Sequence, residues 1–195
     1  MTFQMLKSYP SFYALLFLAS LILAGSYFFP YWVMHLKAPQ YPMGLHMKVY
    51  LDHVEGDVDE VNLLNHYIGM EKLQNAAQWE RKVAALAVGL LILGGLIVLS
   101  FSKKIYFIFY LPPILFLIGF IGDFTFWMYY FGHYLSPEAP VHIKPFMPRL
   151  LGAGKIGQFH TQAMFGVGFW LGFLATGIYM LAINIKKKLL TQAST

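Results

Sequence analysis

The sequence predicts an all-α, polytopic membrane protein with four transmembrane helices and two structured outer loops. Of its 195 residues, 58% are hydrophobic and 12% are charged, whereas soluble domains carry about 25% charged residues. Apolar runs long enough to cross a bilayer core of roughly 30 Å recur along the chain. The lysines gather beside these runs, where orientation signals of membrane proteins belong. These three observations favour a membrane protein.

The predicted spans cover residues 12–34, 83–101, 105–130 and 156–185, within a single integral membrane domain of residues 1–195. The first span ends in an aromatic cluster around Tyr31, which is typical of a membrane interface. A cleaved signal peptide is the alternative for this run, because Lys7 precedes it and small residues follow. The run continues through aromatic residues past those small residues, which disfavours cleavage.

Residues 35–82 and 131–155 form the two predicted outer loops. In the first, Asp57 and Glu60 have the spacing of a capping box, with Asp57 as the N-cap. Val61, Leu64 and Ile68 follow at helical spacing, so a short amphipathic helix is expected here. The second loop contains four prolines, which predict an extended, irregular segment.

The distribution of lysines predicts the topology. One side of the predicted membrane carries Lys7, Lys103, Lys104 and Lys186 to Lys188, without neighbouring acidic residues. The positive-inside rule places this side in the cytoplasm. We therefore expect a multi-pass protein of the cytoplasmic (inner) membrane of a bacterium, with both termini inside and both long loops outside.

Histidine and methionine side chains suggest a metal site in the outer loops. The chain has no cysteine, which excludes disulfides, iron–sulfur clusters and thiolate copper sites. Imidazole and thioether groups remain as ligands suited to copper. The candidate ligands are His46, Met47, His66, Met70 and His133; His66 and Met70 are four residues apart and would share a helical face. The alternative is that these residues pack or form hydrogen bonds without binding a metal.

Asp123 is a second candidate, because an ionisable group inside a predicted span is costly and usually faces a partner or cavity. Together with His160, it could contact a haem or quinone between the helices. The alternative is a structural ion pair or hydrogen bond to the loops, where Lys155, Arg149 or His160 could reach Asp123. No phosphate-binding glycine loop is present, so nucleotide chemistry is not indicated. No catalytic residue is predicted, and the protein is expected to have no catalytic activity of its own.

The segment Asn62-Leu-Leu-Asn-His-Tyr-Ile-Gly-Met70, together with Phe131-Gly-His-Tyr-Leu-Ser-Pro-Glu-Ala-Pro-Val-His-Ile-Lys-Pro-Phe-Met-Pro148, resembles a family of small membrane proteins. These NosB-type proteins are encoded beside the copper enzyme nitrous oxide reductase in some bacterial gene clusters. The resemblance implies an accessory role in nitrous oxide respiration at the outer face of the cytoplasmic membrane. It assigns no residue a catalytic role.

The leading functional prediction is a membrane or accessory subunit of an extracytoplasmic respiratory metalloenzyme system. Such a subunit would dock a protein partner or handle copper at the outer membrane face. A redox subunit that binds haem or quinone between its helices is one alternative. A purely structural assembly subunit is another, and nucleic acid is not expected as a partner.

Overall fold

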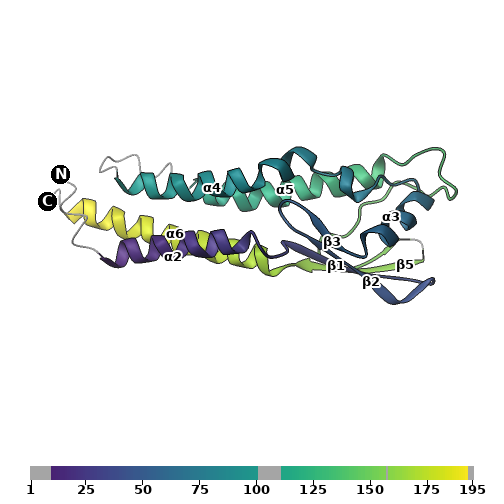
Figure 1. Ribbon diagram of the computed structural model, residues 1–195, viewed down its shortest axis with the longest axis horizontal. Helices are drawn as coiled ribbons and strands as arrows, with labels where there is room; N and C mark the ends of the chain where they lie inside the picture. Colours follow the sequence, from purple (N-terminus) through teal and green to yellow (C-terminus); the bar gives the residue numbers. More distant parts are fainter. Residues whose placement is uncertain (1–9, 101–110, 157, 193–195) are drawn as a thin grey trace.

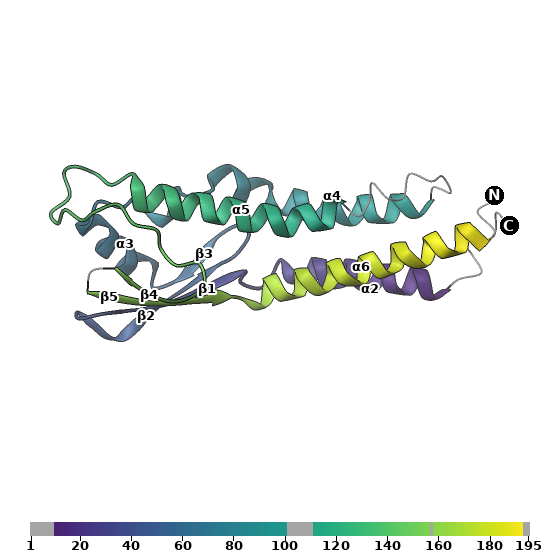
Figure 2. The same cartoon turned by 180° about the vertical axis from the view of Figure 1, so that it is seen from behind.

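A computed structural model describes residues 10–100, 111–156 and 158–192 (Figure 1). The molecule is elongated, with long helices in one half and a β-sheet in the other (Figures 1 and 2). The long helices are α2 (Pro10–Ser26), α4 (Gln78–Ser100), α5 (Leu111–His133) and α6 (Val167–Gln192). Helices α2 and α6 pack along each other, α4 packs on α2, and α5 packs on α6.

The sheet has five antiparallel strands in the order β3-β2-β1-β5-β4. The strands are β1 (Trp32–Ala38), β2 (Tyr41–Val49), β3 (Val54–Gly56), β4 (Gly152–Ile156) and β5 (Phe159–Phe165). The chain passes from α2 into β1, and from β5 into α6. Strands and helices therefore run along the same long axis of the molecule (Figure 1).

The prediction of an all-α fold is wrong, because segments assigned to loops and to the fourth span form this sheet. Strand β5 shows the reason. Thr161 and Ala163 are buried while His160 and Gln162 are exposed, which is the two-residue alternation of a half-buried strand. This segment directly precedes a long apolar run. Because both segments are rich in apolar residues, the prediction assigned the strand and the helix that follows it to one span.

The prediction of four transmembrane helices is also wrong. Among the described residues, two helical segments are long and apolar enough to cross a membrane, Ile114–His133 and Val167–Lys188. The apolar segment Phe12–Ser26 is shorter. The first predicted span had included the start of β1, and the fourth had included β5. The predicted cytoplasmic residues Lys7, Lys103 and Lys104 lie outside the described residues.

The inner face of the sheet forms the main core with α5 and with α3 (Val58–Tyr67). Trp32 is 1% exposed; its ring lies 4.9 Å from that of Phe124, and its indole N–H donates to the Leu150 carbonyl at 2.7 Å. The bond holds the segment between α5 and β4 against the sheet. The second half of α5 thus packs on the sheet, not within the helical half.

Helix α3 confirms the predicted amphipathic helix, with Val61 and Leu64 buried and Asp57 at its N-cap. The capping box does not form, because the Asp57 side chain makes no hydrogen bond to the first turn of the helix. Its carboxylate instead accepts the backbone N–H of His46 at 2.7 Å. The Asn62 side chain fixes the end of the loop by accepting the N–H of Leu73 at 2.9 Å, the first residue of the 3₁₀ helix η1 (Leu73–Asn75).

Candidate functional site: the outward face of the sheet

The outward face of the sheet collects every basic side chain of the five strands. Successive residues of a strand point to opposite faces, so one face is apolar and packs on α3 and α5 while the other is solvated. The basic residues on the outward face are His35, Lys37, His46, Lys48, Lys155 and His160. Glu55 is the one acidic residue in these strands, and it pairs with Lys48 at the β2–β3 edge. The face is therefore basic.

The register places three of these side chains in one row, at the end of the sheet away from α2 and α6. Lys37 of β1 lies opposite His160 of β5, and His160 lies opposite Lys155 of β4. All three are exposed. No acidic residue of the five strands stands in this row. The row is called the basic row below.

His35 and His46 form a stacked pair in the next row. They lie opposite each other on β1 and β2, with ring centroids 4.3 Å apart and planes 6° from parallel. Gly44 permits this arrangement, because a Cβ at its position would overlap the His35 ring. The Nε2 atom of His35 is buried without a hydrogen-bond partner in the described part of the chain. The pair presents the exposed His46 ring beside the basic row.

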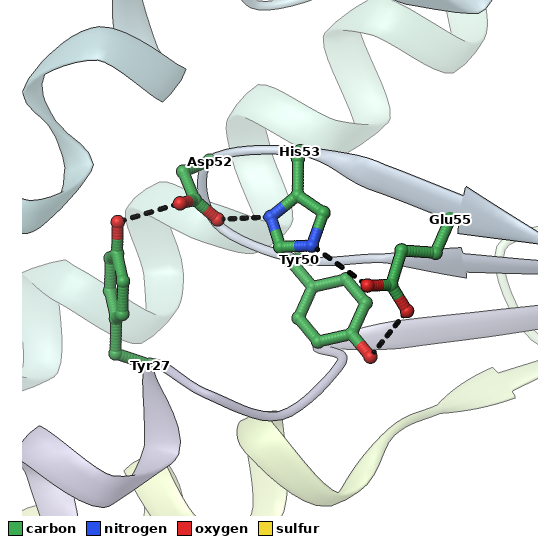
Figure 3. Close-up of polar contacts among 5 residues, drawn as sticks. All are labelled: Tyr27, Tyr50, Asp52, His53 and Glu55. Atoms are coloured by element: carbon green, nitrogen blue, oxygen red, sulfur yellow. Dashed lines mark hydrogen bonds and ion pairs between the residues drawn. The ribbon is translucent and has the colours of Figure 1, made fainter.

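A polar network fixes the turn between β2 and β3 at the junction with the helices (Figure 3). The His53 ring lies between two carboxylates, with Nδ1 2.6 Å from Asp52 and Nε2 3.3 Å from Glu55. Tyr27, just after α2, donates to Asp52 at 2.7 Å, and Tyr50 donates to Glu55 at 3.0 Å. The network, named the junction network below, ties the exit of α2 to the sheet.

The junction network shifts the pKa of its members in opposite directions. Partial burial would lower the pKa of His53, but hydrogen bonds and charge attraction from Asp52 and Glu55 outweigh it and raise that pKa. Partial burial would raise the pKa of Asp52, but hydrogen bonds from Tyr27 and His53 outweigh it and lower that pKa. Both shifts favour the ion pair of imidazolium and carboxylate.

The predicted metal ligands of the first outer loop do not come together. His46 and Met47 are neighbours in β2 and point to opposite faces, so His46 is exposed while Met47 is 3% exposed in the core. His66 is exposed on α3. The helix ends at Tyr67, before Met70, so the four-residue helical spacing of His66 and Met70 does not apply. Met70 packs against the core.

His133 and His160, the candidates near the second loop, also lie apart. The His133 ring stacks on Tyr129 with centroids 3.9 Å apart, and its Nδ1 lies 3.0 Å from the Tyr129 carbonyl oxygen at the end of α5. His160 belongs to the basic row. Within residues 10–100, 111–156 and 158–192, no group of three or more His, Asp or Glu side chains is arranged to hold a metal ion. Copper binding stays a prediction.

Asp123 and His160, predicted to share a cofactor, occupy different places. Asp123 lines a cavity at the junction of helices and sheet, together with Glu80 and Arg81 of α4. His160 lies at a separate hollow on the sheet, beside Lys155. The sequence reasoning missed Glu80, Arg81 and the junction network. Glu80 and Arg81 could have been found in the sequence, because two adjacent charged residues stand at the start of an apolar run.

The chain matches no protein-family model, no curated protein and no solved structure.

Proposed function

We propose that this protein is a membrane-anchored docking subunit whose sheet binds an acidic domain of a partner protein outside the bilayer. The observation that carries the proposal is the basic, solvated face of the sheet. Its inner face is buried against α3 and α5, whereas its outward face gathers three lysines and three histidines around a single acid. A charged face of this kind steers and orients an oppositely charged partner.

The direction of the sheet favours a protein over a lipid surface as the partner. Strands and helices share the long axis of the molecule (Figure 2), so strands stand upright when the apolar helices lie across a bilayer. The outward face then looks sideways and cannot rest on lipid headgroups. The basic row lies at the end of β1 away from α2, so it is far from the part of the molecule where the long helices pack together.

The resemblance to NosB-type proteins suggests the kind of partner, an extracytoplasmic respiratory metalloenzyme or one of its maturation factors. On this proposal the apolar helices anchor the chain in the cytoplasmic membrane of a bacterium, and the sheet lies on the outer side. The protein needs no catalytic group of its own for this role. A redox subunit and a purely structural assembly subunit remain alternative predictions.

The proposal is tested by site-specific photo-crosslinking in cells that contain the full chain. A photoreactive phenylalanine analogue replaces Gln162, which is exposed at the centre of the outward face, and a second chain carries it at Leu63 on α3. We expect a crosslinked protein from position 162 and none of the same mass from position 63. The crosslinked peptide of the partner should contain Asp or Glu residues that lie exposed on the partner's surface.

Charge reversal then decides whether the contact is electrostatic. Lys37→Glu combined with Lys155→Glu should reduce the crosslink at least tenfold, and reversal of the partner's acidic residues to lysine should restore it. Lys144→Glu, an exposed change in the loop before β4, serves as the control and should leave the crosslink unchanged. Crosslinks to lipid, to a second copy of this chain, or to nothing would each overturn the proposal.

A further inference from the structure

Two cavities, each partly open to the surface, lie next to each other along the helices. One, of about 540 Å³, lies among α2, α4, α5 and α6 in the helical half. The other, of about 380 Å³, lies at the junction between α4, α5 and the turn from β2 to β3. Ala87, Leu115 and Phe116 line both, so the two adjoin and are called one space below. Each volume is in the range of pockets that hold a small-molecule ligand.

The helical part of this space is apolar. Its walls come from all four long helices, and leucine, isoleucine, alanine and glycine dominate them; the members include Leu23, Leu90, Leu91, Ile92 and Leu115. Ser20, Thr176 and Tyr179 are the polar side chains in its lining. A hydrocarbon chain is the complement of such a wall, because burial of apolar surface drives binding there.

The junction part contains charged side chains of both signs. Glu80 and Arg81 reach it from the first turn of α4, and Asp123 reaches it from α5. The guanidinium of Arg81 donates to the Leu73 carbonyl at 3.0 Å. The described part of the chain contains no ion pair within 4.0 Å between Arg81 and either carboxylate. Glu80 and Asp123 line the same cavity as Arg81, and the positive charge of Arg81 is attracted to the carboxylates of Asp52 and Glu80.

A buried donor in the same cavity is only poorly paired. The indole N–H of Trp127, one helical turn after Asp123, is buried without a bond that meets hydrogen-bond geometry, although it approaches the Asp123 carboxyl group. A buried donor whose hydrogen bond is poorly formed costs free energy. An acceptor on a bound molecule would remove this cost.

We infer that this space binds one phospholipid with a primary-amine headgroup, such as phosphatidylethanolamine. Its ammonium group lies between Glu80 and Asp123, its phosphate faces Arg81, and the Trp127 N–H donates to a phosphate or ester oxygen. One acyl chain fills the cavity among the helices. Trp79, whose ring lies 5.4 Å from the Lys82 ammonium, stands at the start of α4, and side chains of these two types are common at a membrane interface.

The charges of the junction argue against other amphiphiles. An anionic lipid or fatty acid would meet two carboxylates and one guanidinium, a net repulsion. A neutral headgroup such as a quinone would bring no cation to the two carboxylates of this cavity. A trimethylated ammonium cannot donate hydrogen bonds to them. A zwitterion whose ammonium carries N–H groups satisfies both signs at once.

The test is native mass spectrometry of the full chain in detergent, after incubation with vesicles of phosphatidylethanolamine, phosphatidylglycerol or phosphatidylcholine of identical acyl chains. We expect one retained phosphatidylethanolamine per chain, preferred roughly tenfold or more over the other two lipids, as about 1.4 kcal/mol of headgroup interaction would give. The double variant Glu80→Gln, Asp123→Asn should lose this preference. Glu138→Gln, an exposed change outside the cavity, should keep it.

A second variant tests the binding of the acyl chain and leaves the charged side chains of the cavity unchanged. Ala87→Trp places an indole where the two cavities meet, and retention of all three lipids should fall at least tenfold. Circular dichroism of each variant establishes that it is folded. Equal retention of the three lipids by the wild-type chain, a preference that survives the double variant, or retention of a neutral molecule in place of phospholipid would overturn the inference.

Discussion

Replacing Trp32 with phenylalanine should loosen the segment between α5 and β4 and lower the stability of the sheet. The indole N–H of Trp32 donates to the Leu150 carbonyl at 2.7 Å, and the ring is 1% exposed against Phe124. Phenylalanine keeps an aromatic ring in this place but has no donor. The carbonyl of Leu150 would therefore lose its partner, and part of the ring contact would disappear.

The expected cost is about 2–3 kcal/mol. The lost bond contributes about 1–2 kcal/mol, at the lower part of the usual range because the bond is only partly buried. The smaller ring buries roughly 40 Å² less apolar surface, which adds about 1 kcal/mol. For a chain of this size, each 1 kcal/mol lowers the Tm by roughly 2–4 °C. The Tm should thus fall by roughly 4–12 °C.

The measurement is thermal unfolding followed by circular dichroism in detergent, together with the rate of trypsin cleavage after Arg149, the residue before Leu150. Cleavage should accelerate because the carbonyl tether is gone. Trp79→Phe is the matched control, since Trp79 is 77% exposed, and it should change stability by less than about 0.5 kcal/mol. An unchanged Tm and an unchanged cleavage rate for the Trp32 variant would refute this account of the contact.

Three further outcomes are expected. The raised pKa of His53 stabilises the fold fully at pH values below 6.5, the ordinary pKa of histidine, and this stabilisation is lost as the pH rises through the raised pKa. The lowered pKa of Asp52 stabilises the fold at pH values above 3.8, the ordinary pKa of aspartate, and this stabilisation is lost as the pH falls through the lowered pKa. His53→Gln should therefore flatten the alkaline fall of the Tm, an effect of at most about 1 kcal/mol at this exposed site, and an unaltered pH profile would contradict the role of the network. Gly44→Ala should cost about 1–2 kcal/mol in denaturant unfolding, because φ there is +82° and the new methyl group would displace the His35 ring. Met47→Leu should leave any bound copper unchanged in metal analysis, since Met47 faces the core; loss of metal would show that it is a ligand.

The correct sequence predictions were those carried by one short periodic pattern. Asp57, Val61 and Leu64 predicted helix α3, because a helical stripe of apolar residues needs only local sequence to be recognised. The capping box failed for a tertiary reason. The Asp57 carboxylate bonds to the N–H of His46, which the fold brings to it from the neighbouring strand.

The candidate sites show the same division. The sequence identified His46, His160 and Asp123 as unusual residues, since imidazole and carboxylate groups stand out in an apolar chain. It did not show that Lys37, His160 and Lys155 form one row, because they meet only through the register of three strands. It paired His46 with Met47 as neighbours, although a strand points them to opposite faces.

The sequence by itself determined that this chain is rich in long apolar segments and free of cysteine, because the order and the content of its residues show both. The tertiary structure decided that β1 and β5 are strands. Each segment directly adjoins an apolar helix in the sequence. Its two-residue alternation forms a strand only where antiparallel neighbours supply its hydrogen bonds. Likewise Glu80 and Asp123 are distant in sequence, and only the approach of α4 to α5 and the sheet places both in one cavity.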